Sequence, residues 1–266
     1  MPPVNLQPLT VSLVQGATRW HDAPANRDYY GALARQARGS DLVVLPETFL
    51  SGFSNDTRAS AGTMDGEGVA WLRALAAEVN AVVCGSLAIN EDGTVYNRLF
   101  WMRPDGSHAQ YDKRHLFRMA GEHTRYGGGR ERLVVELKGW RILPQVCYDL
   151  RFPVWLRNRR LEGAAGGMDY DLALFVANWP APRRQPWRTL LRARAIENLA
   201  YVVAPAQGGL HETGRRTWGH SLVADPWGVV LVECSTEGEG LAVATLDAER
   251  LAEVRRQLPA LEHRVL

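Results

Sequence analysis

Short apolar runs alternate with longer stretches of helical periodicity along most of the chain. The runs Leu42–Leu45 and Leu172–Val176 have the length and composition of buried strands. Apolar residues recur at helical spacing in Gly68–Val79 and Trp187–Leu199. This alternation predicts an α/β layered fold. The predicted strands are Leu9–Val14, Leu42–Leu45, Val82–Ile89, Tyr96–Met102, His108–Tyr111, Leu133–Val135, Trp140–Val146, Leu172–Val176, Val202–Ala204, Ser221–Val223, Val229–Val232 and Leu241–Leu246, and the predicted helices are Asn26–Ala37, Gly68–Val79, Trp155–Arg160, Trp187–Leu199 and Ala248–Gln257.

Turn residues divide these elements without marking a linker. Asp92-Gly93 between two strand-like runs predicts a β-hairpin. The stretch Leu116–Arg132 has no clear period and contains the triple glycine Gly127–Gly129. No Gly-Lys-Ser/Thr follows the glycines, so we interpret this stretch as a loop that could act as a lid, not as a phosphate cradle. Because no Pro/Gly/Ser-rich linker interrupts the chain, we predict one domain over residues 1–266.

Three chemically active side chains follow predicted strands. Cys147 ends an apolar run and is followed by a turn, with Pro153 placed to begin a helix. A lone cysteine in such a position is more often a small buried hydrophobe than a nucleophile. Glu47 and Lys113 each stand where a strand ends, the place where α/β proteins position their chemistry. The pattern therefore joins an acid, a cation and a thiol.

The segments around these three residues resemble the nitrilase, or carbon-nitrogen hydrolase, superfamily. They are Leu45–Glu47 (Leu-Pro-Glu), Tyr111–Phe117 (Tyr-Asp-Lys-Arg-His-Leu-Phe) and Cys147–Pro153 (Cys-Tyr-Asp-Leu-Arg-Phe-Pro). The resemblance covers nearly the whole chain and implies a single-domain, four-layer αββα sandwich with a Glu-Lys-Cys site. Further matching stretches are Ala177–Pro180, Arg192–Glu197 and Gly219–Gly228.

Within the superfamily, two parts of the chain resemble different branches. Tyr111–Val203 is similar to bacterial omega-amidases, which hydrolyse the amide of 2-oxoglutaramate or 2-oxosuccinamate. Gln207–Gly228 is closer to deaminated-glutathione amidases. The resemblance therefore implies a small-molecule amide substrate, with an omega-amidase as the first interpretation. A deaminated-glutathione amidase and an N-carbamoyl hydrolase stay open as alternatives.

The resemblance also implies a role for each site residue. Cys147 would be the nucleophile, and Glu47 would act as general base and then as general acid. Lys113 would favour the thiolate and, with the backbone N–H of Tyr148, stabilise the oxyanion. Glu122 matches the second glutamate of the family and would orient Lys113, although it could equally be an acid on the surface of a loop.

A 2-oxo acid substrate needs a further cation for its carboxylate. Arg183 and Arg184, just after the strand Leu172–Val176 and its Asn-Trp-Pro motif, are our candidates. Asn178 could donate to the substrate through its side chain. Trp179 and Trp187 could form walls of the pocket, although tryptophan near a helix start is at least as often part of the core.

Other enzyme classes fit the sequence less well. A phosphatase of the Cys-x5-Arg type would need five residues between its cysteine and arginine, whereas only three separate Cys147 from Arg151. Arg151 could reach a substrate carboxylate, but the family resemblance implies a structural ion pair, which is the interpretation that we prefer. The histidines are scattered without a close pair, so we predict neither a metal site nor any other cofactor. A catalytically silent scaffold remains a further alternative, which the intact Glu47, Lys113 and Cys147 argue against.

Composition limits the partners and the compartment. Lys and Arg number 31 and Asp and Glu 29, a net charge of +2, so we predict binding to neither nucleic acid nor an anionic membrane. Three cysteines at unrelated spacings, with no signal peptide, favour a reducing cytoplasm. The family resemblance implies a homodimer. An apolar stripe on the terminal helix fits packing on a partner or on its own core.

Overall fold

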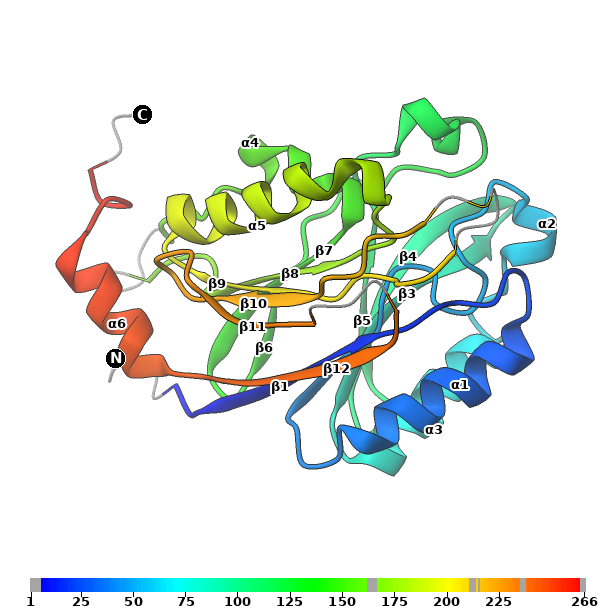
Figure 1. Ribbon diagram of the computed structural model, residues 1–266, viewed down its shortest axis with the longest axis horizontal. Coiled ribbons are helices and arrows are strands. Elements are labelled where there is room, and N and C mark those ends of the chain that lie inside the picture. Colours follow the sequence, from blue (N-terminus) through cyan, green and yellow to red (C-terminus); the bar gives the residue numbers. More distant parts are fainter. Residues whose placement is uncertain (1–5, 162–166, 211–213, 215, 235–237, 264–266) are drawn as a thin grey trace.

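Two β-sheets lie face to face, with helices on the outer face of each (Figure 1). This arrangement comes from a computed structural model that describes residues 6–161, 167–210, 214, 216–234 and 238–263. Within these residues each sheet has six strands, in the orders β12-β1-β2-β3-β4-β5 and β11-β10-β9-β8-β7-β6. Helices α1 and α3 pack on the first sheet and α5 on the second. The predicted four-layer αββα sandwich is confirmed.

Most of the predicted elements form close to their expected bounds. The strands are β1 (Leu9–Gln15), β2 (Leu42–Val44), β3 (Val82–Glu91), β4 (Thr94–Met102), β5 (His108–Asp112), β6 (Val135–Leu137), β7 (Trp140–Val146), β8 (Leu172–Val176), β9 (Tyr201–Ala204), β10 (Leu222–Ala224), β11 (Val230–Glu233) and β12 (Gly240–Leu246). The α-helices are α1 (Ala23–Gln36), α2 (Thr57–Ser60), α3 (Glu67–Val79), α4 (Pro153–Leu156), α5 (Arg184–Asn198) and α6 (Ala248–Gln257), and the short 3₁₀ helices are η1 (Arg118–Ala120), η2 (Glu122–Thr124), η3 (Cys147–Arg151) and η4 (Ala181–Arg183).

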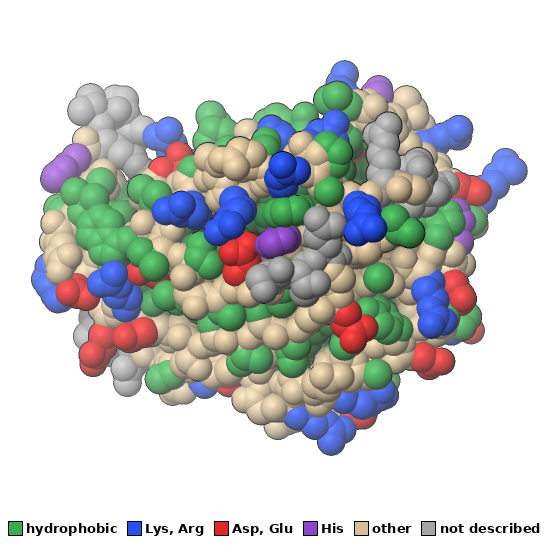
Figure 2. Space-filling view, in the orientation of Figure 1, with side chains coloured by type: hydrophobic (Ala, Val, Ile, Leu, Met, Phe, Trp, Pro, Cys, Tyr) green, Lys and Arg blue, Asp and Glu red, His purple; other side chains and the backbone are tan. Residues whose placement is uncertain are grey.

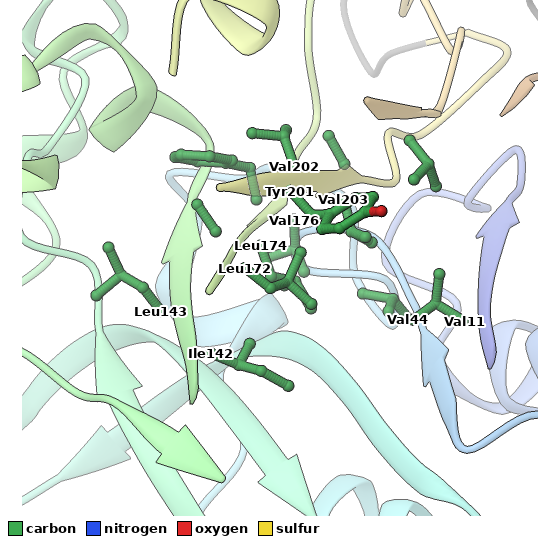
Figure 3. Packing of buried hydrophobic residues seen from close by; sticks show 14 of the residues in the cluster. Val11, Val44, Ile142, Leu143, Leu172, Leu174, Val176, Tyr201, Val202 and Val203 are labelled. Carbon is green, nitrogen blue, oxygen red and sulfur yellow. The ribbon is translucent and has the colours of Figure 1, made fainter. Parts of the chain in front are cut away.

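Alternating side chains of the first sheet serve two apolar layers. In β2, Val43 packs with α1 and α3, whereas Leu42 and Val44 point into the space between the sheets. Figure 3 shows the inner layer, in which Val11 and Val44 share one cluster with residues of β7, β8 and β9. Strand β8 is buried along its whole length because both of its faces are covered.

The helix predicted at Trp155–Arg160 is wrong in extent. Helix α4 ends at Leu156, and Arg157 is already extended, with φ −58° and ψ 126°. The cause is Asn158, which is fully buried. Its side chain donates to the carbonyl of Tyr170 (2.8 Å) and accepts from the N–H of Tyr170 (3.1 Å), so the chain is drawn away from a helical path.

The loop predicted at Leu116–Arg132 includes the two 3₁₀ helices η1 and η2, and its triple glycine lies against the first sheet. The N–H of Gly127 donates to the carbonyl of Val95 (2.8 Å), and the N–H of Gly129 donates to that of Lys113 (3.0 Å). A Cβ on Gly129 would lie 2.1 Å from the carbonyl oxygen of Asp112, so this close approach requires glycine. The glycines hold the loop against the strand end that carries Lys113. A lid function stays a prediction.

Parallel strand directions bring the site together. β1, β2 and β3 are parallel to one another, and so are β7, β8 and β9. β5 is antiparallel to β4, which is antiparallel to β3, so β5 runs in the same direction as β2. The carboxyl ends of β2 and β5 therefore lie at the same end of the first sheet. The carboxyl ends of β7 and β8 likewise lie at one end of the second sheet. Glu47, Lys113, Cys147 and Asn178 follow these four ends.

The surface has no single dominant sign of charge on the face shown in Figure 2. Lys and Arg side chains are spread among acidic and apolar side chains there. Among the described residues, none of the helices is both long and apolar enough to cross a membrane.

Candidate active site

The thiol of Cys147 lies at the start of a tight turn. Cys147 has φ +44°, in the left-handed region that non-glycine residues rarely adopt, and it opens the 3₁₀ helix η3. Only 9% of Cys147 is exposed, and its Sγ lies 3.7 Å from the carbonyl oxygen of Asn178. Strained backbone of this kind is concentrated at functional sites, where the surroundings hold it in place.

The carboxylate of Glu47 is held by three donors. Its Oε1 accepts from Nζ of Lys113 (2.9 Å) and from Nδ2 of Asn97 (2.8 Å), and its Oε2 accepts from the N–H of Asn178 (2.8 Å). Glu47 itself has no exposed surface. A buried carboxylate with three hydrogen bonds has a fixed position, as a general base requires.

Lys113 lies between two carboxylates. Its Nζ also donates to Oε1 of Glu122 (2.9 Å) and lies 5.2 Å from the ring centroid of Phe53. Burial alone lowers the pKa of Lys113, but the charges of Glu122 and Glu47 outweigh it and hold the pKa well above the ordinary value. Lys113 is therefore a permanent cation in the site.

Glu122 belongs to the cluster, so its interpretation as a surface acid is wrong. It is fully buried, and its Oε2 accepts from the N–H of Phe117 (2.5 Å). Burial raises the pKa of Glu122, with the charge of Glu47 acting in the same direction and Lys113 opposing both. The position of Glu122 beside Nζ agrees with its predicted role of orienting Lys113.

The surroundings of Cys147 favour its neutral thiol over the thiolate. Burial is the main cause that raises its pKa well above the ordinary value, and the charge of Glu47 adds to it, while Lys113 lowers it. Attack by a neutral thiol requires a base, and Glu47 is the carboxylate that we predict for this role.

A cavity of about 580 Å³ opens over this cluster. Cys147, Glu47, Lys113 and Asn178 belong to its wall. The rest of the wall is apolar and aromatic, with three arginines and one exposed acid. Its other lining residues are Phe53, Asn55, Asp56, Phe117, Met119, Ala120, Tyr148, Arg151, Trp179, Pro180, Arg183, Arg216 and Thr217.

The predicted substrate-binding residues divide into two groups. Trp179 and Arg183 line the cavity, and the guanidinium of Arg183 lies 5.1 Å from the ring centroid of Phe117. Arg184 is exposed and outside the lining, where it lies over Trp218. Trp187 is fully buried behind Trp179, at 5.2 Å between ring centroids, and belongs to the core.

Asn178 contributes mainly through its backbone. Its N–H holds Glu47, its carbonyl lies at the thiol, and its side-chain Nδ2 donates to Oε1 of Gln207 (2.8 Å). The side-chain donor that we expected to face a substrate is thus already engaged.

The structural ion pair predicted for Arg151 is wrong. Within the described part of the chain, no carboxylate lies within ion-pair distance of Arg151. Its guanidinium instead lies 5.4 Å from the ring centroid of Trp179 and lines the cavity.

Two residues that contact the site were missed in the sequence. Asn97, in the middle of β4, donates to Glu47 and also lies 3.4 Å from Oε1 of Glu122. Gln207 donates to the backbone carbonyl of Glu47 (2.6 Å). Asn97 interrupts the apolar positions of its strand, and that interruption was the only signal. Among the described residues, no group of three His, Cys, Asp or Glu side chains could hold a metal ion.

Residues 10–256 match the carbon-nitrogen hydrolase family. The chain is 44% identical to the omega-amidase YafV of Yersinia enterocolitica over 95% of both chains. It is 34% identical to the 2-oxoglutaramate amidase of Bacillus subtilis over 86% of this chain and 87% of the other. It is also 33% identical to the deaminated glutathione amidase of a Synechocystis strain, with the same coverage.

A solved structure agrees with these matches. XC1258 of Xanthomonas campestris, described as a CN-hydrolase superfamily protein with an arsenic adduct in the active site, superimposes with a TM-score of 0.95. It is 52% identical and covers 98% of both chains. Fold, site and sequence together define a hydrolase of carbon-nitrogen bonds. This chain belongs to the carbon-nitrogen hydrolase family.

Proposed function

We propose that this chain is an omega-amidase that hydrolyses the terminal amide of 2-oxoglutaramate or 2-oxosuccinamate through a thioester on Cys147 and releases ammonia. One observation carries the chemistry: Lys113 bridges Glu47 and Glu122 at the wall of the cavity that holds the Cys147 thiol. The relatives named above support the choice of amide.

In the first half of the reaction, Glu47 takes the proton of Cys147 as the sulfur attacks the amide carbon. Negative charge then develops on the carbonyl oxygen. Lys113 and the N–H of Tyr148, the second residue of η3, would donate to it, because the first N–H groups of a helix have no intrahelical partner. Glu47 returns the proton to the leaving nitrogen, which departs as ammonia.

In the second half, Glu47 activates water. The water attacks the thioester carbon, the bond to sulfur breaks, and the thiol regains its proton as the carboxylic acid leaves. Glu122 would hold Lys113 in place throughout, because its Oε1 accepts from Nζ of Lys113 (2.9 Å). No metal or cofactor enters these steps.

Arg183 is the residue that we propose for the substrate carboxylate. It lines the cavity and is half-buried, whereas Arg184 is exposed and directed elsewhere. A guanidinium binds a carboxylate with two parallel hydrogen bonds, which would fix the far end of the substrate while its amide meets Cys147. Of the two arginines predicted from sequence, we retain the first.

The size of the cavity favours deaminated glutathione as a second candidate. A cavity of about 580 Å³ lies in the range that ordinarily holds larger ligands than a small 2-oxo acid amide. Arg151 and Arg216 also line it and would face a second carboxylate. We expect residues 127–132 and 208–217 to set the shape of the pocket. Arg216 and Thr217 line the cavity, no residue of 127–132 does, and residues 211–213 and 215 lie outside the described part of the chain.

The test is the formation of 2-oxoglutarate by the purified protein from 2-oxoglutaramate and from deaminated glutathione, each offered alone. We expect a higher kcat/KM with the small amide, and no product with Cys147→Ala. A preference for the tripeptide analogue would move the assignment to the second candidate. Lack of product from both would reject both and direct the search to N-carbamoyl compounds.

The homodimer and the cytoplasmic location are also proposals, based on family resemblance and on cysteine usage. Sedimentation of the purified protein at several concentrations tests the first. A mass of one chain at all concentrations would reject the dimer.

A further inference from the structure

A further buried carboxylate, Asp149, lies behind the site and takes no part in the steps above. It has no exposed surface and does not line the cavity. Four donor atoms contact it, and they belong to Tyr111 in β5, His115 in the loop after β5 and Val146 at the end of β7. This placement distinguishes it from the structural ion pairs at the surface of the molecule.

One contact of Asp149 encloses the nucleophile. Oδ2 of Asp149 lies 3.2 Å from the N–H of Val146, so the side chain closes a ring around Cys147 and Tyr148. These are the residues that supply the thiol and the proposed oxyanion N–H. The ring helps to hold Cys147 at φ +44°, a conformation that costs about 1–3 kcal/mol unless its surroundings maintain it.

The other three contacts lie on both sides of the catalytic lysine. Tyr111 donates to Oδ2 through its hydroxyl (2.9 Å), and His115 donates to Oδ1 through its N–H (2.9 Å). Nδ1 of His115 also lies 2.7 Å from Oδ1. Tyr111 is two residues before Lys113 and His115 two residues after it. One carboxylate therefore binds both flanks of Lys113 and both flanks of the Cys147-Tyr148 pair.

We propose that Asp149 is a positioning residue that sets the distance between the Lys113 ammonium and the Cys147 sulfur. The inference rests on the proposed amidase chemistry, because that chemistry needs both groups at one carbonyl. Lys113 follows a strand of the first sheet and Cys147 a strand of the second. Backbone hydrogen bonds within one sheet therefore cannot fix the distance between these two residues. Asp149 joins the two sheets at the site.

The substitution Asp149→Asn tests this. An amide is isosteric with the carboxylate but turns one acceptor into a donor that faces N–H groups. We expect kcat to fall about 100-fold, the loss that a misplacement of about 1 Å can cause, with KM within about threefold. Alkylation of Cys147 by iodoacetamide, followed by peptide mass spectrometry, should need a higher pH, because Lys113 would stabilise the thiolate less.

Two further variants separate positioning from folding. Asp225→Asn is the matched control, since Asp225 is also buried and accepts from the N–H groups of Trp227 and Val229 (both 2.9 Å), away from the site. It should lower Tm and leave kcat and the alkylation profile unchanged. Tyr111→Phe removes one of the four donors and should lower kcat about tenfold. If Asp149→Asn does not fold, the kcat and the alkylation profile of Tyr111→Phe test the proposal instead.

The proposal is overturned if the folded variants at positions 149 and 111 keep kcat within about threefold of the wild type. It is overturned equally if their alkylation profiles coincide with the wild-type profile. Because alkylation needs no substrate, it decides the matter even if the wild type does not hydrolyse 2-oxoglutaramate. Failure of the proposed substrate is thus distinguished from failure of the positioning role.

Discussion

The inner and outer walls of the cavity are built in different ways. At the inner wall, Glu47 and Lys113 are completely or almost completely buried, and each makes at least two charged or backbone hydrogen bonds. At the outer wall, Arg183 and Arg151 lie over aromatic rings, and Met119 is 79% exposed. The hydrogen bonds of the inner wall hold the catalytic side chains in place. The outer wall presents cations and apolar surface whose side chains can adjust to a bound substrate.

Mutations at the two walls should therefore have different effects on catalysis and stability. Changes at the inner wall should lower kcat and disturb the buried charges, because each side chain there has fixed partners. Changes at the outer wall should raise KM and alter the choice of amide with little effect on kcat or on folding.

The largest effect should come from Lys113→Met. Loss of an oxyanion donor lowers kcat by about 10²–10³. Two buried carboxylates would also lose their cation, which costs about 3–5 kcal/mol in the free energy of unfolding. The burial of Lys113, Glu47 and Glu122 makes both losses large. Steady-state kinetics and denaturant unfolding measure the two effects.

The pH dependence of that stability loss follows from the raised pKa of Lys113. A basic group with a raised pKa in the folded state contributes its full stabilisation below its unfolded pKa, and loses it as pH rises through the folded pKa. The difference in unfolding free energy between wild type and Lys113→Met should therefore stay constant at neutral pH and narrow above about pH 10.5. A difference that widens at high pH would contradict the assigned charge.

Arg183→Ala should have a smaller effect than Lys113→Met, and the effect should be on KM instead of kcat. Loss of a charge-assisted hydrogen bond to the substrate carboxylate should raise KM about tenfold to 100-fold, with kcat within a few fold. Arg184→Ala is the matched control, because Arg184 is the neighbouring arginine outside the cavity. Equal KM values for both variants and the wild type would remove Arg183 from the binding site.

The smallest effect is a shift in the reactivity of Cys147 in Glu47→Gln. The charge of Glu47 helps to raise the pKa of the thiol, so its removal should lower that pKa and speed alkylation severalfold at pH 7 to 8. The same variant should lose turnover because the base is gone. Slower alkylation would show that Glu47 does not raise the pKa of the thiol.

The sequence predicted the inner wall better than the outer one. Glu47, Lys113 and Cys147 follow buried strands, and strand ends are recognisable from apolar runs and turn residues. Once the strands are parallel, their ends must meet. The direction of an arginine at a helix end has no such signal, and this is why Arg151, at the end of η3, and Arg184, at the start of α5, were placed incorrectly or left open.

The supporting residues could not be predicted for another reason. Asn97 contacts Glu47, and Asp149 contacts the residues on either side of Lys113. These contacts join segments far apart in the chain and depend on the register of the strands. Asn158 ended a helix by binding the backbone of Tyr170, a contact equally absent from local periodicity. Local propensity predicts elements, but tertiary hydrogen bonds decide where they end.

The most direct test of the central claim is a rapid acid quench of the protein during turnover of 2-oxoglutaramate, followed by peptide mass spectrometry. We predict the acyl group of the substrate on the peptide that contains Cys147, and neither adduct nor turnover in Cys147→Ala. An acyl group on another residue, or a kcat in Cys147→Ala close to that of the wild type, would contradict a thioester mechanism at this site.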